Sequence, residues 1–495
     1  MSVVLALDAG TTGVRTFAVG DDGAPRGFAY RELTQHYPRP GWVEHDASEI
    51  WDVMSATIGE VVASLDGEPV AAIGITNQRE TTVVWDRRTG EPRHRAIVWQ
   101  DRRTADRCRI LTDAGHLDTV RTTTGLVLDP YFSGTKLAWL ITDGGVDVDA
   151  DLAFGTVDSW LLWKLTGGAV HATEPSNASR TLLFDIGTLS WSDEMCDLLG
   201  VPTSCLPELL PSSGALGVTS GVDALPDGTP VTGIAGDQQA ALFGQACVKP
   251  GMTKNTYGTG SFVLMNIGSE RPDPVEGLLT TVGWSLGDVT ADATSYALEG
   301  AIFATGAAVG WLRDGLGIIA DAAEVEPLAA SIDSTEGVHL VPAFTGLGSP
   351  WWDPYARGTV VGITRGTSRA HLARAVVESM AFQTRDVVDA MSSAWGHPVS
   401  ALRADGGASV MDLLLQLQAD QLGVTVARPD VAETTALGAA YLAGLAAGVW
   451  ASIEEVAAMW TLDREFTPQV PAATADAAHG QWLRAVERSR AWAGT

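Results

Sequence analysis

Residues 3–20 read Val-Val-Leu-Ala-Leu-Asp-Ala-Gly-Thr-Thr-Gly-Val-Arg-Thr-Phe-Ala-Val-Gly, two apolar runs separated by a polar turn that is rich in glycine and threonine. Each run has the length and composition of a buried strand, so the stretch predicts a β-hairpin. The backbone N–H groups and hydroxyls of such a turn can bind an anion. The tip of the hairpin is therefore a candidate phosphate-binding site.

Two further turns of this kind follow apolar strands later in the chain. They are Gly258-Thr-Gly-Ser261 and Gly406-Gly-Ala408. A single glycine-rich turn is most often an ordinary tight turn, but three of them at strand ends favour nucleotide binding. The sequence contains neither the GxxxxGK[ST] motif of P-loop proteins nor the HRD and DFG motifs of protein kinases, so both of those architectures are disfavoured.

The domain organisation follows from the same pattern. The second turn repeats the strand-turn-strand arrangement of the first, which predicts two similar domains, one over residues 1–248 and the other over residues 249–495. Strand-like runs at residues 70–75, 97–99 and 230–236 alternate with helical stretches at 50–62 and 413–422, which indicates an α/β fold. A further helical stretch, residues 435–448, is rich in alanine and glycine and permits close helix packing in a core.

Composition excludes several other classes of protein. The chain carries 60 acidic and 32 basic residues, a formal net charge of −28, so we expect no nucleic-acid partner. The first residues lack a basic leader, and no apolar run approaches the ~20 residues that span a bilayer, so we expect a cytoplasmic protein without stable membrane insertion. The four cysteines are widely spaced, which predicts reduced thiols and no zinc site.

Four acidic or basic residues could carry chemistry. Asp8 precedes the first turn and is a candidate magnesium ligand. Asp237 stands where a predicted strand opens into a predicted helix, where it could orient or deprotonate a hydroxyl for phosphoryl transfer, or simply cap the helix. Arg79 and Glu80 follow an apolar strand and could bind a polyol through donation and acceptance of hydrogen bonds, or form a surface ion pair.

Longer motifs extend these hints over nearly the whole chain. The sequence resembles the FGGY carbohydrate kinase family, and within it the members that phosphorylate glycerol, in Gly41-Trp-Val-Glu-His-Asp46, Gly74-Ile-Thr-Asn-Gln-Arg-Glu-Thr-Thr82, Asp129-Pro-Tyr-Phe-Ser-Gly-Thr-Lys136, Gly236-Asp-Gln-Gln-Ala-Ala-Leu-Phe-Gly244 and Phe344-Thr-Gly-Leu-Gly-Ser-Pro-Trp-Trp-Asp-Pro-Tyr-Ala-Arg-Gly358. The resemblance implies two actin-like (ribonuclease H-like) domains with a catalytic cleft between them. It also implies phosphorylation of glycerol by ATP and Mg²⁺ at the 3-hydroxyl, in a homo-oligomer that is a dimer or a tetramer.

Residue roles are carried over position by position. The resemblance implies that glycerol binds to Arg79, Glu80, Trp99, Tyr131, Asp237, Gln238 and Phe262, with Asp237 as the general base. It implies that ATP binds to Thr11, Thr12, Gly13, Arg15, Thr259, Gly306, Gly310, Gly407 and Met411, with magnesium near Asp8.

The sequence departs from the family pattern at three of these positions. Gly13 stands where many relatives have serine, so only its backbone can contact a phosphate. Gly310 and Met411 stand where well-known relatives have glutamine and asparagine, so we expect fewer hydrogen bonds to the edge of the base.

Two alternative functions remain open from the sequence. The first is a kinase for another polyol or ketose, such as erythritol or xylulose; the combination of Arg79, Glu80, Trp99 and Phe262 favours the small triol. The second is an actin-like ATP-binding sensor or filament protein without small-molecule kinase activity. A protein of that second class would be expected to lack Asp237 or the Arg79 and Glu80 pair, and this chain retains all three.

Overall fold

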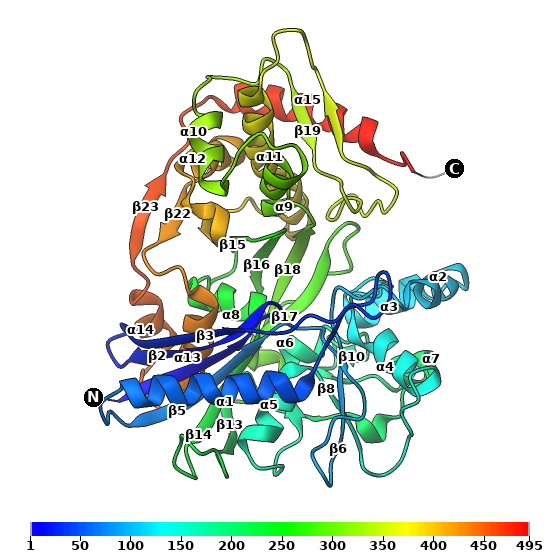
Figure 1. The fold of residues 1–495 in the computed structure, drawn as a ribbon, viewed down its shortest axis with the longest axis vertical. Coiled ribbons are helices and arrows are strands. Elements are labelled where there is room, and N and C mark those ends of the chain that lie inside the picture. The colour runs from blue at the N-terminus through cyan, green and yellow to red at the C-terminus, as the bar shows by residue number, and fades with distance from the viewer. Residues whose placement is uncertain (1, 494–495) are drawn as a thin grey trace.

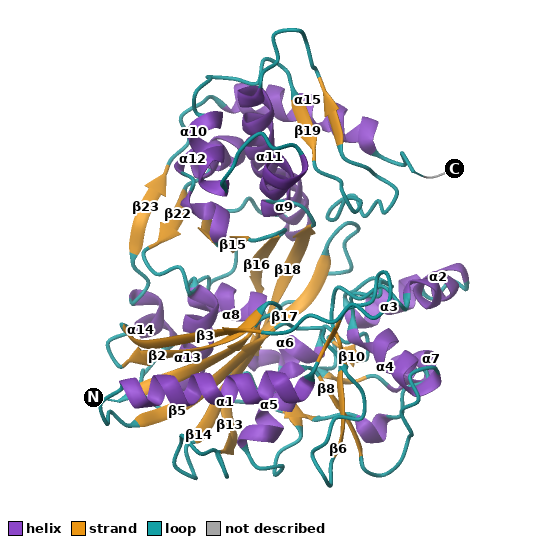
Figure 2. Cartoon of the chain, viewed as in Figure 1, coloured by secondary structure: helices purple, strands orange, loops and turns teal. Residues whose placement is uncertain are grey.

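Two large mixed sheets, one from each half of the chain, organise the structure (Figures 1 and 2), a computed structural model that describes residues 2–493. The first sheet has the order β13-β14-β5-β1-β2-β3, with strands β1 (Val3–Ala9), β2 (Gly13–Gly20), β3 (Pro25–Glu32), β5 (Val70–Asn77), β13 (Ser213–Val218) and β14 (Pro230–Gly236). The second sheet has the order β17-β18-β16-β15-β21-β22-β23, with strands β15 (Met252–Tyr257), β16 (Ser261–Gly268), β17 (Leu279–Ser285), β18 (Thr294–Ile302), β21 (Ala401–Asp405), β22 (Val426–Pro429) and β23 (Leu462–Phe466).

Helices and short strand pairs surround the two sheets. The helices are α1 (Ala47–Ser64), α2 (Ala105–Asp113), α3 (Leu117–Thr124), α4 (Ser133–Thr142), α5 (Val157–Leu165), α6 (Pro175–Ala178), α7 (Asp193–Leu199), α8 (Asp237–Gly244), α9 (Gly306–Gly310), α10 (Val325–Ala329), α11 (Arg369–Trp395), α12 (Asp412–Leu422), α13 (Thr434–Ala446), α14 (Ile453–Ala458) and α15 (Ala472–Ser489). The short pairs are β4 (Glu44–His45) with β7 (Ala96–Ile97), β6 (Val83–Asp86) with β8 (Leu152–Gly155), β9 (Ala172–Thr173) with β12 (Glu208–Leu209), β10 (Phe184–Asp185) with β11 (Ser190–Trp191), and β19 (His339–Val341) with β20 (Thr359–Val361).

The predicted hairpin is confirmed, and so is its repetition. Strands β1 and β2 pair antiparallel around the first turn, and β1 also pairs parallel with β5, which in turn pairs parallel with β14. In the second sheet, β15 and β16 form the matching antiparallel hairpin, and β15 pairs parallel with β21. Because parallel strands end at the same edge of a sheet, the residues after β1, β5 and β14 lie together, as do those after β15 and β21.

The expected strand at residues 97–99 is shorter than predicted. Only Ala96–Ile97 of this stretch forms a strand, β7, and it pairs with β4 in a separate two-stranded sheet. Two residues beyond the strand, Trp99 donates a side-chain hydrogen bond from Nε1 to Thr11 Oγ1 at 2.8 Å. This segment therefore connects to the first turn through a side chain rather than through a sheet.

Helix α13 belongs to the second half of the sequence but packs on the first sheet. It lies against β1, β5, β14 and helix α8, and Figure 1 shows its orange ribbon beside the blue strands of the first half. Gly438 of α13 allows the approach, since a Cβ atom there would stand 1.8 Å from the carbonyl oxygen of Ala240 in α8. The division of the chain at residues 248 and 249 remains a prediction, but in space the second half supplies one layer of the first sheet.

All four cysteines lie in the interior of the protein. Cys108, Cys196, Cys205 and Cys247 are buried and free. Over residues 2–493, no helix is both long enough and apolar enough to cross a bilayer.

The close approach of α13 and α8 predicts a stability effect. We expect Gly438→Ala to destabilise the protein by about 1–3 kcal/mol or more, because the new Cβ meets a backbone carbonyl that cannot rotate away. Gly480→Ala in helix α15 is the matched control; no atom lies within 4 Å of its Cβ position, so higher helix propensity should stabilise it by about 0.5–1 kcal/mol. Urea unfolding midpoints of the two variants measure the difference, and equal shifts would contradict this account.

Candidate active site

The carboxyl ends of three parallel strands place the predicted acidic and basic residues together. Asp8 is at the end of β1, Arg79 and Glu80 follow β5, and Asp237 follows β14. Helix α8 begins at Asp237 itself, and its N-cap residue is Gly236, so the capping interpretation of Asp237 is wrong. The carboxylate of Asp237 accepts a hydrogen bond from the backbone N–H of Gln238 at 2.7 Å. Its side chain remains 30% exposed, so a substrate can reach it.

Arg79 and Glu80 are buried, each only 2% exposed, and the surface ion pair considered for them is therefore wrong. The Arg79 guanidinium donates from Nη2 to the Tyr131 hydroxyl at 3.1 Å and from Nη1 to Gln239 Oε1 at 3.3 Å. Its Nε atom lies 3.3 Å from Asp237 Oδ1 and 3.6 Å from Glu80 Oε1. One arginine thus connects the segment after β5 with the segment after β14.

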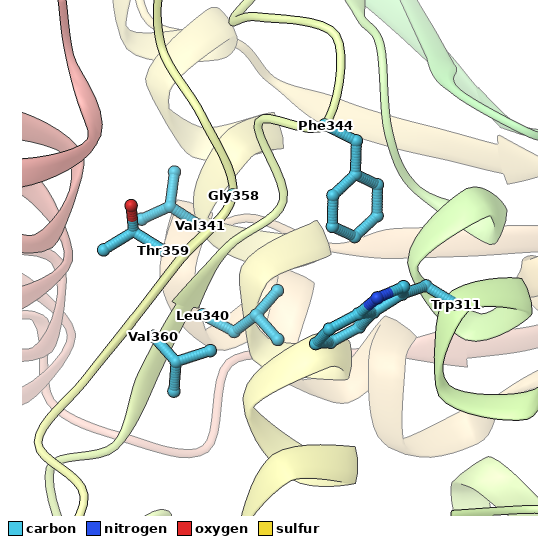
Figure 3. Close-up of a pocket in the computed structure, with 7 residues that line it drawn as sticks. All are labelled: Trp311, Leu340, Val341, Phe344, Gly358, Thr359 and Val360. Carbon is cyan, nitrogen blue, oxygen red and sulfur yellow. The ribbon is translucent and has the colours of Figure 1, made fainter. Parts of the chain in front are cut away.

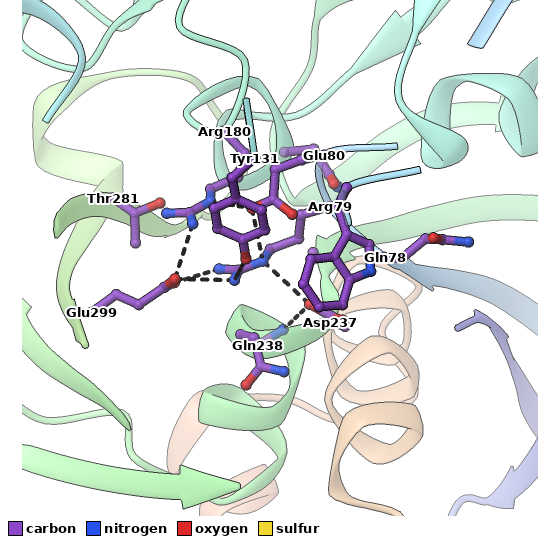
Figure 4. A network of polar contacts seen from close by, with 12 residues as sticks. Gln78, Arg79, Glu80, Tyr131, Arg180, Asp237, Gln238, Thr281 and Glu299 are labelled. Atoms are coloured by element: carbon purple, nitrogen blue, oxygen red, sulfur yellow. Dashed lines mark hydrogen bonds and ion pairs between the residues drawn. The ribbon is translucent and has the colours of Figure 1, made fainter. Parts of the chain in front are cut away.

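Two buried charged residues at this site were missed by the sequence reasoning. Glu299, on β18 of the second sheet, accepts hydrogen bonds from both Nη atoms of Arg79 and from Nη2 of Arg180, the last at 2.9 Å. Arg180, just after α6, also donates from Nε to Glu80 Oε1 at 2.7 Å. Figure 4 shows the guanidinium of Arg79 between Glu299 on one side and Asp237 on the other. The sequence signal that could have identified Glu299 was its position as a single acidic residue inside the apolar run that forms β18.

Aromatic side chains border the same site. The rings of Trp99 and Tyr131 meet edge to face with centroids 5.6 Å apart, and the Phe262 ring lies 5.8 Å from the Arg79 guanidinium carbon. The indole of Trp99 also reaches the first turn through its hydrogen bond to Thr11. The site therefore combines charged groups with apolar walls, the combination that a small polyol requires.

The electrostatics of the site set its acid–base properties. Burial raises the pKa of Asp237 to about 6; Arg79 opposes that shift, and Glu80 and Asp8 add to it. Burial also disfavours ionised Glu299, but Arg180 and Arg79 outweigh burial and lower its pKa to about 2. Asp237 can therefore gain and lose a proton near neutral pH, whereas Glu299 keeps its charge.

The first turn brings together the residues predicted for the phosphates. Thr12 is exposed, Thr11 is half-buried and Gly13 is buried at the start of β2. A Cβ atom on Gly13 would stand 2.4 Å from the carbonyl oxygen of Arg31, so the packing of β3 requires glycine here. Arg15 is directly opposite Asp8 in the hairpin, with its Nε 3.1 Å from Asp8 Oδ2, and its Nη1 donates to Glu433.

The predicted nucleotide residues of the second half differ in exposure: Thr259 and Gly407 are exposed, whereas Met411 is buried. Thr259 is exposed on the turn after β15, and the N–H of Gly306 donates to the carbonyl oxygen of Gly258 at 3.0 Å, so the start of α9 lies against this turn. Gly407 is exposed after β21, which is the parallel neighbour of β15. Gly310 ends α9, and Met411 is only 5% exposed and packs in the hydrophobic core of the second half.

Gln238 is linked to a buried lysine of the second sheet. The Lys254 ammonium donates to Gln238 Oε1 and, at 2.9 Å, to Thr256 Oγ1. Burial lowers the pKa of Lys254 to about 8. Lys254 is a third residue, after Glu299 and Arg180, that sequence reasoning did not assign to the site, although it stands only four residues before the second turn.

A cavity of about 300 Å³ shares no lining residue with the charged cluster around Arg79 and Asp237 (Figure 3). Its lining residues are Trp311, Leu340, Val341, Phe344, Gly358, Thr359 and Val360. The lining is largely apolar and contains no charged side chain, so it cannot compensate the charge of a phosphate. We therefore place the active site at the charged cluster and not at this cavity.

Comparison with known proteins agrees with the geometry. Residues 3–244 match the model of the N-terminal domain of the FGGY family of carbohydrate kinases, and residues 253–447 match the C-terminal domain of that family. A glycerol kinase from Trichlorobacter lovleyi is 56% identical over the full length of both chains, and one from Bordetella parapertussis is 54% identical over 99% of this chain and 97% of that protein.

Solved structures show the same fold. A glycerol kinase from Plasmodium falciparum, determined with ADP, superposes with a TM-score of 0.93 at 34% identity, covering 99% of this chain and 98% of that one. A xylulose kinase from Lactobacillus acidophilus, at 20% identity and a TM-score of 0.88, shares the fold. The expected α/β kinase fold is confirmed, and the chain belongs to the FGGY family of carbohydrate kinases.

Proposed function

We propose that this protein transfers the γ-phosphoryl group of ATP to the 3-hydroxyl of glycerol and releases sn-glycerol 3-phosphate and ADP. The observation that carries the proposal is the arrangement of Arg79 Nε, Asp237 and Glu80, one hydrogen-bond donor facing two carboxylates within 3.3 and 3.6 Å. The full-length similarity to glycerol kinases supports the choice of acceptor. The use of ATP is supported by the structural relative from Plasmodium falciparum, whose structure was determined with ADP.

The hydrogen bonds of Arg79 determine which of its donors a substrate can use. A guanidinium has five N–H groups, and the four on Nη1 and Nη2 are occupied by Glu299, Gln239 and Tyr131. The N–H on Nε remains for a hydroxyl that accepts from Arg79 and donates to a carboxylate. Because Tyr131 accepts from Arg79, its own hydroxyl proton is free to donate to the substrate. Glycerol, with three hydroxyls and a small apolar face, fits between this donor set and the aromatic walls of Trp99 and Phe262.

Asp237 acts as the general base in this proposal. Its carboxylate accepts the proton of the 3-hydroxyl while that oxygen forms a bond to the γ-phosphorus of ATP. The bond between the γ-phosphorus and the bridging oxygen breaks, and ADP leaves with that oxygen. Arg79, beside Asp237, holds the acceptor so that only one hydroxyl faces the phosphorus.

The turns supply the contacts for ATP. We assign its phosphates to Thr11, Thr12, Gly13 and Arg15 on the first turn and to Thr259 on the second. Its adenosine is assigned to Gly306, Gly310, Gly407 and Met411. Met411 is buried, so its side chain would shape the pocket by packing and would not donate a hydrogen bond to the base.

A divalent cation fits the end of β1. Asp8 offers a carboxylate next to the first turn, and its burial raises its pKa to about 6 against the opposing effect of Arg15, so a nearby cation would favour the ionised form. Carboxylate and phosphate oxygens are the ligands that Mg²⁺ prefers. Asp8 would hold Mg²⁺, which when bound would neutralise phosphate charge. The homo-oligomer and the cytoplasmic location expected from the sequence remain predictions.

An acceptor comparison tests the function directly. ADP release is measured with ATP and Mg²⁺ and with glycerol, dihydroxyacetone, erythritol, xylulose or no acceptor at matched concentrations. We expect kcat/KM for glycerol to exceed the others by at least about tenfold, the effect of ~1.4 kcal/mol in transition-state binding. A larger kcat/KM for another acceptor would mean that the kinase activity is correct but the assignment of glycerol to the acceptor pocket is wrong. If no acceptor stimulated ADP release, the proposed kinase activity would be contradicted.

Replacement of Asp237 separates catalysis from folding. We expect Asp237→Asn to lower kcat by about 10²-fold or more, because the amide cannot accept the hydroxyl proton. The melting temperature at pH 7.5 should equal or exceed that of the wild type. The pKa of Asp237 is raised from 3.8 to about 6, so its ionisation costs stability above pH 6, and asparagine removes that cost. Near-normal turnover would mean that Asp237 only positions glycerol.

The same pKa predicts the pH profile. Protonated Asp237 cannot act as a base, so kcat/KM for glycerol should fall about tenfold per pH unit below a midpoint near 6. Steady-state rates between pH 5 and 8 measure the profile, and the weak residual activity of Asp237→Asn should lack this limb. A limb that persists unchanged in the variant would belong to another group.

A further inference from the structure

We propose that Glu299 is a positioning residue for the acceptor, through which the second sheet controls the affinity of the site for glycerol. The inference rests on the proposed function, because it assigns a role in binding that acceptor. Glu299 would not touch glycerol; it would act by holding Arg79 in the orientation that glycerol requires.

The geometry places Glu299 behind Arg79 with respect to the substrate. The Glu299 side chain is fully buried on β18, and its two carboxylate oxygens accept from both Nη atoms of Arg79. Asp237 and Glu80 approach the same guanidinium on its Nε side. The carboxylate of Glu299 thus occupies the Nη edge of Arg79 and leaves the Nε edge toward the acceptor.

Loss of the Glu299 carboxylate would change which hydrogen-bond acceptors Arg79 contacts. Both Nη atoms would lose an acceptor, and the strongest acceptors nearby are the carboxylates of Asp237 and Glu80. A guanidinium that turns toward them would occupy the oxygens that glycerol hydroxyls would otherwise donate to. We therefore expect weaker glycerol binding, although Glu299 itself lies outside the contact surface.

The balance of charge supports the same conclusion. Arg79 and Arg180 are neutralised by Glu80 and Glu299 in a cluster whose four side chains are at most 2% exposed. An uncompensated buried charge is unfavourable, so removal of one carboxylate would strengthen the attraction of Arg79 for Asp237. The expected effect is again on acceptor binding.

Glu299 also connects the acceptor site to the nucleotide half. It pairs across the sheet with Leu264 of β16 and with Leu279 of β17, and β16 begins directly after the second turn. The first sheet carries Arg79, Asp237 and Glu80, but the group that orients Arg79 comes from the second sheet. The acceptor site is therefore complete only when the two sheets adopt this relative position.

The test is the kinetics of Glu299→Gln, which keeps the shape of the side chain and removes its charge. We expect the KM for glycerol to rise about tenfold or more, while the KM for ATP at saturating glycerol stays within about twofold. The matched control is Glu378→Gln on α11. The carboxylate of Glu378 accepts a hydrogen bond from Arg374 at 2.8 Å and takes no part in the buried cluster. Both KM values of the control should stay at the wild-type level.

Several results would overturn the inference. An unchanged KM for glycerol in folded Glu299→Gln would do so, and so would parallel increases in both KM values together with a lower melting temperature. If Glu299→Gln does not fold, the double variant Glu299→Gln with Arg180→Gln is used, because it removes one charge of each sign and keeps the cluster neutral. Its KM for glycerol must still rise while its KM for ATP does not. If the wild type prefers another acceptor, the same separation of KM values is measured with that acceptor; without any acceptor-dependent turnover, the proposed function fails as well.

Discussion

The buried charge cluster of Arg79, Glu80, Arg180 and Glu299 is the constraint on which the active site depends. Removing ions from water costs several kcal/mol per group, so each charge in such a place must have a partner of opposite sign and good geometry. Here the partners come from different parts of the chain, and Glu299 belongs to the other sheet. The requirement for neutrality therefore also determines how the two sheets meet.

Burial has a second consequence at the edge of this cluster. Asp237 shares the low-dielectric surroundings of Arg79, but its side chain is partly exposed and its charge is compensated less completely than that of Glu299. Its pKa therefore rises, while that of Glu299 falls. Two carboxylates that contact the same guanidinium acquire different properties, one as a base and one as a permanent charge, because their surroundings differ.

The close packing of helix α13 explains how a segment of the second half can support the first sheet. Small residues let α13 approach α8 and the strands so closely that backbone atoms are in contact. Two hydroxyl groups of the first half also donate to carbonyl oxygens of α13. Thr232 donates to Ala443 at 2.9 Å, and Ser213 donates to Leu442 at 2.7 Å. Just before this helix, Glu433 reaches Arg15 beside the first turn. The turn that we assign to phosphate is thus supported from both halves of the chain.

Local sequence was sufficient to predict the strands and turns that are set by the hydrophobic pattern and turn residues of the segment itself. Apolar runs and turn residues predicted the hairpin at residues 3–20, its repetition after Lys254, and the strand that ends before Asp237. Their places after predicted strands made Arg79, Glu80 and Asp237 candidate site residues, and the resemblance to the FGGY family implied their roles. Only the tertiary structure decided that Arg79 and Glu80 are buried, that Asp237 is not a helix cap, and that Arg180, Glu299 and Lys254 join them. Those facts depend on contacts between residues as far as 220 positions apart, and no local pattern of hydrophobicity records such contacts.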